Sequence, residues 1–193
     1  EIGSGLVGSE MCIRDRLVLY RGEAKQFRMR EGSTLSDEEE HQLIYEVVGK
    51  RAKRRTMHLL EQMDRTEQQL RDKLKQGGYP QACIDLALEY VKSFHYVDDY
   101  RYACTYINYR QDRMSRYQLK VKLYGKGVSG ELIDRALEEC YEGDEQDQII
   151  RLLEKKKFDA QNSDPKEFTR VYQYLMRRGF RSNDVLRAMK SKQ

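Results

Sequence analysis

The stretch LRDKLKQGGYPQACIDLAL, residues 70–88, sets two apolar residues four positions apart, then a glycine turn, then two more apolar residues four apart. The same phrase returns as LKVKLYGKGVSGELIDRAL at residues 119–137 and as VYQYLMRRGFRSNDVLRAM at residues 171–189. The second copy begins 49 residues after the first, and the third begins 52 residues after the second. Such a period is typical of a repeat protein, in which each unit buries its apolar face partly against its neighbours.

Helix-start and helix-stop signals divide the chain into three three-helix modules. Each copy of the phrase is preceded by a further predicted helix, at residues 50–63, 99–110 and 146–157. The N-cap signals that open the copies are Asp64-x-x-Glu67, Ser115-x-x-Gln118 and Asp164-Pro165-x-Glu167, and Ser129 and Ser182 are expected to cap the helices after the turns. The glycines that end the helices in a left-handed conformation are Gly77-Gly78, Gly127 and Gly179. The expected fold is an all-α, elongated and curved tandem array of helix-turn-helix-like modules at residues 50–97, 98–143 and 144–193.

The N-terminal part of the chain does not follow the repeat. Residues 1–16 lack periodicity and look like a translated sequencing-library adapter, so we exclude them from fold reasoning. Residues 17–49 form an extension, in which Leu17–Arg30 predicts a short β-hairpin with its turn at residues 21–23. A capping box, Ser36-x-x-Glu39, then opens a helix that either breaks at Gly49 or continues through it.

Composition and motifs favour binding over catalysis. Charged residues make up 35% of the chain and hydrophobic residues 39%, which suits solvated amphipathic helices with modest cores. The four cysteines are scattered, which favours reduced thiols in a cytosol. The three histidines are isolated, and no phosphate loop or nucleophile elbow occurs, so we expect no enzyme activity, cofactor or metal. Asp98-Asp99 resembles a carboxylate pair, but N-capping of the next helix explains it better. No apolar run is long enough for a membrane span.

Basic residues recur on successive modules, and tyrosines are dense in the second. Cations placed away from the apolar face suit phosphates, although any single cluster is more simply a solvated helix face. Tyr102 and Tyr106 are expected to line the core, whereas Tyr109 and Tyr117 are better candidates for an interface. The expected contact surface comprises Arg51, Arg54, Arg55, Arg65, Arg71, Lys73, Tyr109, Arg110, Arg113, Arg116, Tyr117, Lys120, Lys122, Arg177 and Arg178.

Several of these segments together resemble the RecX family of recombination regulators. The matching segments are Arg65-Thr66-Glu67-x-x-Leu70-Arg71-x-Lys73-Leu74, Gly78-Tyr79, Tyr96-Val97-Asp98-Asp99-x-Arg101-Tyr102-Ala103, Lys122-Leu123-x-x-Lys126-Gly127-Val128 and Tyr174-Leu175-Met176-Arg177-Arg178-Gly179-Phe180. The resemblance covers roughly residues 35–190, and its segments follow one another in the family's order and spacing.

The resemblance implies a bacterial, cytoplasmic, all-helical protein that acts without chemistry of its own. Such proteins bind the filament of the RecA recombinase on DNA and block its extension or promote its disassembly. They thereby lower RecA ATPase, strand exchange and coprotease activity, and with them homologous recombination and the SOS response. We accordingly expect a monomer that binds the RecA filament, and DNA only weakly and without sequence preference, away from membranes.

A rival hypothesis is a stand-alone helix-turn-helix DNA-binding regulator. The last helices of the first two modules argue against it, because Asp85, Glu89, Asp134 and Glu138 would repel phosphates.

Overall fold

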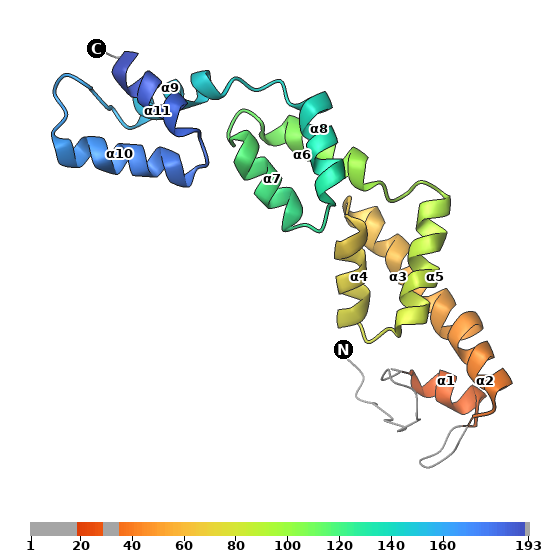
Figure 1. The fold of residues 1–193 in the computed structure, drawn as a ribbon. Helices are drawn as coiled ribbons and strands as arrows, with labels where there is room; N and C mark the ends of the chain where they lie inside the picture. Colours follow the sequence, from red (N-terminus) through yellow and green to blue (C-terminus); the bar gives the residue numbers. More distant parts are fainter. Residues whose placement is uncertain (1–18, 29–34, 192–193) are drawn as a thin grey trace. The chain divides into compact units, whose positions relative to one another are not determined.

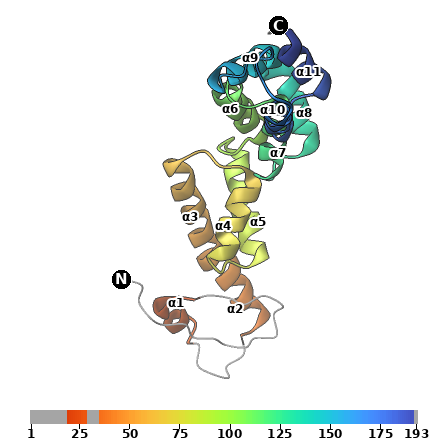
Figure 2. The same ribbon diagram turned by 90° about the vertical axis from the view of Figure 1, so that its left-hand side faces the viewer.

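The computed structural model describes residues 19–28 and 35–191. The chain divides into two compact units, the first ending at Asp98 and the second beginning at Asp99. Within the described ranges every regular element is a helix and none is a strand, which confirms the all-α prediction (Figures 1 and 2). Residues 1–16, which look like adapter sequence, lie outside the described ranges.

The first unit carries the first copy of the repeat. It contains α1 (Arg21–Gln26), α2 (Asp37–Gln42), the π-helical segment η1 (Leu43–Val48), α3 (Gly49–Gln62), α4 (Glu67–Gln76) and α5 (Gln81–Ser93). α3 packs along α5, and α4 contacts both of them. The four apolar residues of the repeated phrase, Leu70, Leu74, Ile84 and Leu88, are buried in this core. The four-residue spacing of apolar residues that defines the repeat therefore places them all in the core of the unit.

Gly49 sits within a continuous helix. Its backbone is α-helical, with φ −62° and ψ −44°, and it joins η1 directly to α3. A Cβ built on Gly49 would lie 2.9 Å from the carbonyl oxygen of Ile44. A glycine at this position therefore lets the backbone pass close to the widened π turn before it. Of the two possibilities that the sequence left open, continuation is the one that the structure adopts.

The predicted β-hairpin at residues 17–30 is wrong in the part that the structure describes. Its turn residues lie in α1, where the Tyr20 N–H donates to Glu23 Oε2 at 2.8 Å. Leu19 and Ala24 are buried, and Phe27 packs against the core of the first unit. A helix satisfies its backbone hydrogen bonds internally, whereas an isolated hairpin has marginal stability. The segment therefore forms a helix that packs on the core, despite its alternating sequence pattern.

The second unit carries the other two copies. It contains α6 (Asp99–Arg110), α7 (Arg116–Tyr124), α8 (Gly130–Cys140), α9 (Glu145–Lys155), α10 (Pro165–Arg177) and α11 (Ser182–Ser191). Leu119, Leu123, Ile133 and Leu137 are buried in one hydrophobic cluster, formed by α6, α7 and α8. A separate cluster joins α9, α10 and α11, so each copy of the phrase has its own core. The three helices predicted to precede the copies correspond to α3, α6 and α9, each beginning within one residue of the predicted start.

Most of the predicted caps and turns are confirmed. The side chains of Ser115, Ser129 and Asp164 accept hydrogen bonds from the backbone N–H groups of Gln118, Leu132 and Glu167. The turn glycines with positive φ are Gly78 at 74°, Gly127 at 83° and Gly179 at 78°. Only glycine adopts this conformation at little cost, which explains its recurrence at the same place in each copy.

Two predicted caps are wrong. α4 is capped by Thr66, whose side chain accepts from the Gln69 N–H at 3.2 Å, and not by Asp64. Thr66 is fully buried where Asp64 is exposed, so the chain enters the helix two residues later than the acidic signal indicated. Ser182 lies inside α11 as its first residue, and its hydroxyl instead pairs with the Tyr172 hydroxyl at 2.9 Å.

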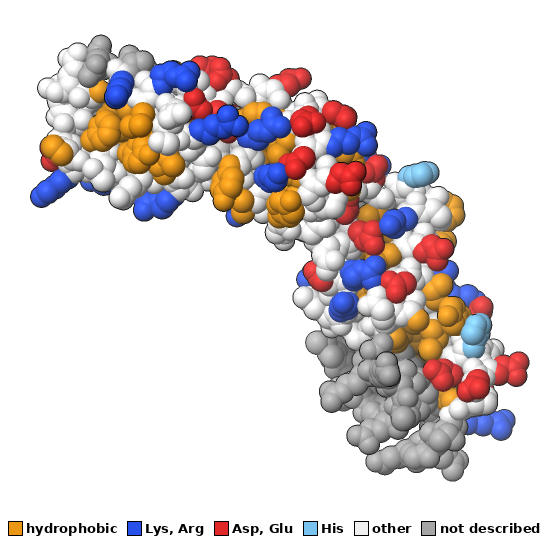
Figure 3. Space-filling model, in the orientation of Figure 1, with side chains coloured by type: hydrophobic (Ala, Val, Ile, Leu, Met, Phe, Trp, Pro, Cys, Tyr) orange, Lys and Arg blue, Asp and Glu red, His pale blue; other side chains and the backbone are white. Residues whose placement is uncertain are grey.

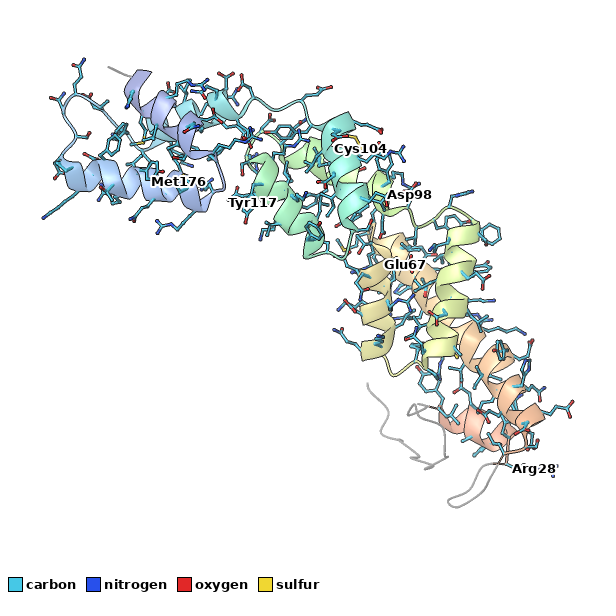
Figure 4. All side chains as sticks on the ribbon, in the orientation of Figure 1. Arg28, Glu67, Asp98, Cys104, Tyr117 and Met176 are labelled. Atoms are coloured by element: carbon cyan, nitrogen blue, oxygen red, sulfur yellow. A yellow bond between two sulfur atoms is a disulfide. The ribbon has the colours of Figure 1, made fainter. Side chains whose placement is uncertain are left out.

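The expectation of reduced thiols is overturned for one pair of cysteines. Cys104 on α6 and Cys140 on α8 form a disulfide, with their Cα atoms 5.6 Å apart (Cys104 is labelled in Figure 4). The two residues are 36 positions apart in the sequence and meet because α6 packs along α8. Cys83 is free and buried, and burial raises the pKa of its thiol to about 11.

Candidate interaction surface

Arg51 stabilises the packing of the first unit. Its guanidinium donates to Glu23 Oε2 at 2.7 Å and lies 4.4 Å from the centroid of the Tyr20 ring and 5.3 Å from that of Tyr79. Only 18% of the Arg51 side chain is exposed. Because these contacts fix α1 against α3, we leave Arg51 out of the candidate surface, although the sequence pattern included it.

Arg65 and Arg71 are also occupied within the first unit. Arg65 Nε donates to the carbonyl oxygen of Leu59 at 3.4 Å, near the end of α3. Arg71 pairs with Asp85 at 2.6 Å and with Glu67 at 3.3 Å, and thereby ties α4 to α5. Both arginines are half-buried, so we leave them out of the candidate surface as well.

Three other predicted cations of this unit are exposed, namely Arg54, Arg55 and Lys73. Arg54 lines a shallow groove of about 510 Å³ between α3 and α5, which Lys53 and Tyr90 also line. The Lys53 ammonium lies 5.2 Å from the centroid of the Tyr90 ring. The groove therefore combines cations with an exposed aromatic ring.

In the second unit the predicted residues near the end of α6 are exposed. Tyr109 is 82% exposed, and Arg110 and Arg113 are exposed too. The Arg110 guanidinium lies 5.6 Å from the centroid of the Tyr106 ring. Tyr106 is stacked on Tyr102 and packs against the core, as the sequence predicted for that pair.

On α7 the cations and the core leucines lie on different faces. Arg116 and Lys122 are exposed, whereas Leu119 and Leu123 are fully buried. Lys120 forms an ion pair with Asp134 on α8. The outward position of the first two cations agrees with the expectation, whereas Lys120 is held to its own module.

The ion pair of Lys120 repeats that of Arg71. Lys120 follows Arg71 by 49 positions, and Asp134 follows Asp85 by the same number, so both pairs join the same two helices of successive copies. Hydrogen bonds from Gln81 and then Arg71 lower the pKa of Asp85, and the hydrogen bond to Asp134 raises the pKa of Lys120. The opposite charges at the same two positions of both copies were visible in the sequence and could have predicted these ion pairs.

α7 begins at the boundary with the following module. The Ser115 hydroxyl donates to the carbonyl oxygen of Arg178 at 2.5 Å, and the Arg116 backbone N–H donates to Glu145 Oε1 at 2.7 Å. The Tyr117 ring lies against Gly179, where any Cβ would overlap it. Of the predicted contact residues of α7, Tyr117 thus meets the turn at Arg178 and Gly179. Arg177 is exposed, and the Arg178 guanidinium lies 4.7 Å from the centroid of the Tyr174 ring.

A buried glutamine reinforces this boundary. Gln148 is 5% exposed, and its Nε2 donates to the Gln111 carbonyl oxygen at 2.6 Å and to the Tyr141 hydroxyl at 3.2 Å. The Gln111 side chain in turn accepts from the Glu142 N–H at 2.8 Å. Burial raises the pKa of Tyr141. These contacts hold the α6–α7 connection against the start of α9.

Two further surface residues, Val121 and Tyr124, lie outside the contact surface predicted from the sequence. With Tyr117 they form a stripe along the outer face of α7 at spacings of four and three, and the three side chains are 61%, 49% and 51% exposed in chain order. We call Tyr117, Val121 and Tyr124 the α7 stripe. Figure 3 shows hydrophobic side chains among basic and acidic ones over this region. The helical spacing of exposed apolar residues was the available signal.

Two kinds of feature were sought among the described residues, a metal-binding cluster and a membrane-spanning helix. In residues 19–28 and 35–191 no three His, Cys, Asp or Glu side chains are grouped so that they could hold a metal ion. Among the same residues, no helix combines the length and apolar character that a membrane span requires.

Family models match all three modules in order. The model of the RecX first three-helix domain matches residues 52–90, that of the second domain matches residues 98–137, and that of the third matches residues 143–189. Together these matches cover well over half of the chain.

Curated relatives and solved structures agree with these matches. The chain is 29% identical to regulatory protein RecX of Caldanaerobacter subterraneus, over 83% of this chain and 80% of that protein. It is 32% identical to RecX of Geobacillus kaustophilus, over 86% of this chain but only 62% of that longer protein.

Among solved structures, a regulatory protein RecX has the same fold, with a TM-score of 0.70 at 20% identity over 91% of this chain and 94% of that one. RecX from Lactobacillus salivarius gives 0.65 at 17% identity over 75% of this chain and 96% of that one. The three consecutive domain matches carry the assignment: the chain belongs to the RecX family of regulatory proteins.

Proposed function

We propose that this protein is a cytoplasmic regulator that binds the RecA filament on DNA and limits or disassembles it. The observation that carries the proposal is that all three RecX domains occur in one chain in their proper order. The proposed consequence is lower RecA ATPase, strand exchange and coprotease activity, and so a damped SOS response. The protein acts by contact, as a monomer, and forms no covalent intermediate.

Several exposed cations support a binding role of this kind. Arg54 and Arg55 in the first unit, and Arg113, Arg116 and Lys122 in the second, are all exposed. A filament on DNA presents phosphates and a repeating protein surface, and tandem modules gain affinity when several weak contacts form at once. Exposed cations on successive modules suit such a target.

The decisive test is a titration of the DNA-dependent ATPase of the cognate RecA. The protein is expected to inhibit the ATPase at well below one copy per RecA protomer, because stopping growth at a filament end affects many protomers. Absence of inhibition at an equimolar ratio would falsify the proposal.

A charge reversal then tests whether the exposed cations Arg113 and Arg116 contact the filament. The double variant Arg113→Glu, Arg116→Glu is expected to weaken filament binding about tenfold while leaving helical content unchanged, since both side chains are exposed. The matched control reverses Arg170 and Arg187, whose side chains are 76% and 71% exposed on α10 and α11. Equal inhibition by both double variants would mean that the basic surface lies elsewhere.

The second candidate, a stand-alone DNA-binding regulator, predicts tight and sequence-selective duplex binding without RecA. Asp85 and Asp134 are each more than half exposed on the last helices of their modules, α5 and α8. Carboxylates on those helices disfavour insertion into a major groove. Duplex binding that is weak, salt-sensitive and indifferent to sequence would support the first candidate.

A further inference from the structure

The α7 stripe is an apolar strip that its own module does not require. The equivalent residues of α4, 49 positions earlier, are Gln68, Asp72 and Lys75, and all three are exposed. Gln68 Nε2 donates to Asp72 Oδ1 at 2.8 Å, so polar side chains on this face of α4 form a hydrogen bond with each other. Because α4 and α7 bury the same leucine pair, packing of the module core does not explain two tyrosines and a valine on the outside of α7.

The two tyrosines of the stripe lie close against glycines. The Tyr117 ring lies against Gly179, and the Tyr124 hydroxyl lies where a Cβ on Gly130 would be. Gly179 has a positive φ of 78° and is needed for the turn, but Gly130 is the first residue of α8 and has no such requirement. The absence of a side chain at Gly130 therefore leaves room for the Tyr124 hydroxyl.

The charges that α7 itself contributes are basic, and two carboxylates of neighbouring helices, Glu145 and Asp134, contact it at the Arg116 N–H and at Lys120. α7 carries three cations and no acidic residue, whereas α4 mixes both signs. Lys120 is paired with Asp134, which leaves Arg116 and Lys122 exposed at the border of the stripe. Two copies of such a face would repel each other, so the charge favours a partner with carboxylates around an apolar strip.

We propose that the α7 stripe is a protein-docking surface, which takes a partner surface with an apolar strip bordered by carboxylates. The spacing of four and three places all anchors on one side of a helix, which is the pattern of helix-mediated protein recognition. Tyrosine with neighbouring arginine is also the residue combination enriched at interface hot spots. Val121 between the rings favours protein over nucleic acid, because an aliphatic side chain offers no face for base stacking. This inference rests on the proposed function, which makes the partner the RecA filament.

The test exchanges the stripe for its α4 counterpart. The variant Tyr117→Gln, Val121→Asp, Tyr124→Lys keeps the net charge and all the cations, and its side chains are those that the equivalent helix already carries. Binding of the full chain is measured to RecA filaments on single-stranded DNA and, separately, to the same DNA without RecA. Filament binding is expected to weaken about thirtyfold or more, as for the loss of two aromatic anchors. Binding to bare DNA is expected to stay unchanged.

Two further variants keep the test independent of folding. Gly130→Ala retains every stripe residue but displaces the Tyr124 ring, so a smaller loss of filament binding is expected. Tyr45→Gln removes an exposed tyrosine of η1, outside both the stripe and the predicted contact surface, and is expected to bind filaments as the wild type does. Circular dichroism and the urea midpoint establish that each variant is folded.

The remaining outcomes overturn the inference in different ways. Equal losses on filaments and on bare DNA would make the stripe a nucleic-acid surface. An unchanged affinity of the triple variant for filaments would remove the stripe from the interface and leave the proposed function intact. Failure of the wild type to bind filaments would remove both.

Discussion

α4 and α7 occupy the same place in successive copies of one repeat, and they differ almost entirely in what they present outward. Both bury two leucines four positions apart, and both are capped by a hydroxyl that accepts from the third helical N–H. Both also form an ion pair to the last helix of the module at the same offset. The outer face is polar on α4 and aromatic on α7. The repeat therefore constrains the inner face, and the outer face is free to acquire a partner.

The same comparison extends to α10 in the third module. The positions 52 residues after the α7 stripe hold Thr169, Gln173 and Met176, of which Met176 is 36% exposed (Figure 4 labels Tyr117 and Met176). Only the middle module thus carries tyrosines at these places. This singles out α7 within a set of helices that share one architecture.

The largest expected effect comes from breaking what the two helices share. Leu70→Ala and Leu119→Ala each remove a fully buried side chain, and each should lower the free energy of unfolding of its own unit by about 3 kcal/mol. Urea unfolding with hydrogen exchange assigns each loss to a unit. The stripe exchange on α7 is the control and should cost much less, because its residues are exposed. A stripe exchange as costly as Leu119→Ala would mean that the outer face also supports the fold.

The sequence predicted the repeated core of α4 and α7 and the tyrosine-rich character of the middle module, but not that Val121 and Tyr124 share one exposed face with Tyr117. Leucine spacing, turn glycines and the caps at Ser115 and Asp164 are local signals, and the structure confirms them. The hairpin predicted at residues 17–30 failed in its described part, because an isolated hairpin is marginal and its turn residues lie in the helix α1. The candidate surface could be predicted only in part from the sequence, because the ion pairs of a side chain depend on the tertiary structure. A count of cations cannot distinguish Arg71, which forms two ion pairs, from the exposed Arg113.

A smaller effect is expected where α7 joins the following module. The Ser115 side chain caps α7 and also donates to the Arg178 carbonyl oxygen, whereas Ser129 only caps α8. Ser115→Ala should therefore cost about 2 kcal/mol and Ser129→Ala about 1 kcal/mol of unfolding free energy in the second unit. Urea unfolding of both variants gives the comparison. Equal costs would mean that the bond to Arg178 adds no stability.

The ion-pair network of α4 should make its unit sensitive to acid. The pKa of Glu67 is lowered, chiefly by the hydrogen bond from Lys92 and further by Arg71, against the opposing effect of burial. A carboxyl with a lowered folded-state pKa stabilises the fold above its unfolded pKa, and the contribution is lost as the pH falls through the folded value. Glu67→Gln should thus cost about 1 kcal/mol near neutral pH.

The pH dependence distinguishes this role from packing. The cost of Glu67→Gln should shrink below the ordinary carboxyl pKa of 4.5 and vanish once wild-type Glu67 is protonated. Unfolding midpoints of the wild type and the variant, measured across this range, provide the test. A cost that persists in acid would show that the variant disturbs the contact of α4 with α5 by its shape.

The smallest effect is expected at the ion pair of α7. Asp134→Asn removes the partner of Lys120, but the two side chains are 54% and 37% exposed, so solvent and salt screen the pair and the unfolding midpoint should barely move. The released Lys120 then adds a cation beside the α7 stripe, and filament binding should stay equal or tighten slightly. The counterpart Asp85→Asn, which has no stripe beside it, should leave filament binding unchanged. Weaker filament binding by Asp134→Asn at unchanged stability would contradict the assignment, since it would make the carboxylate itself a contact.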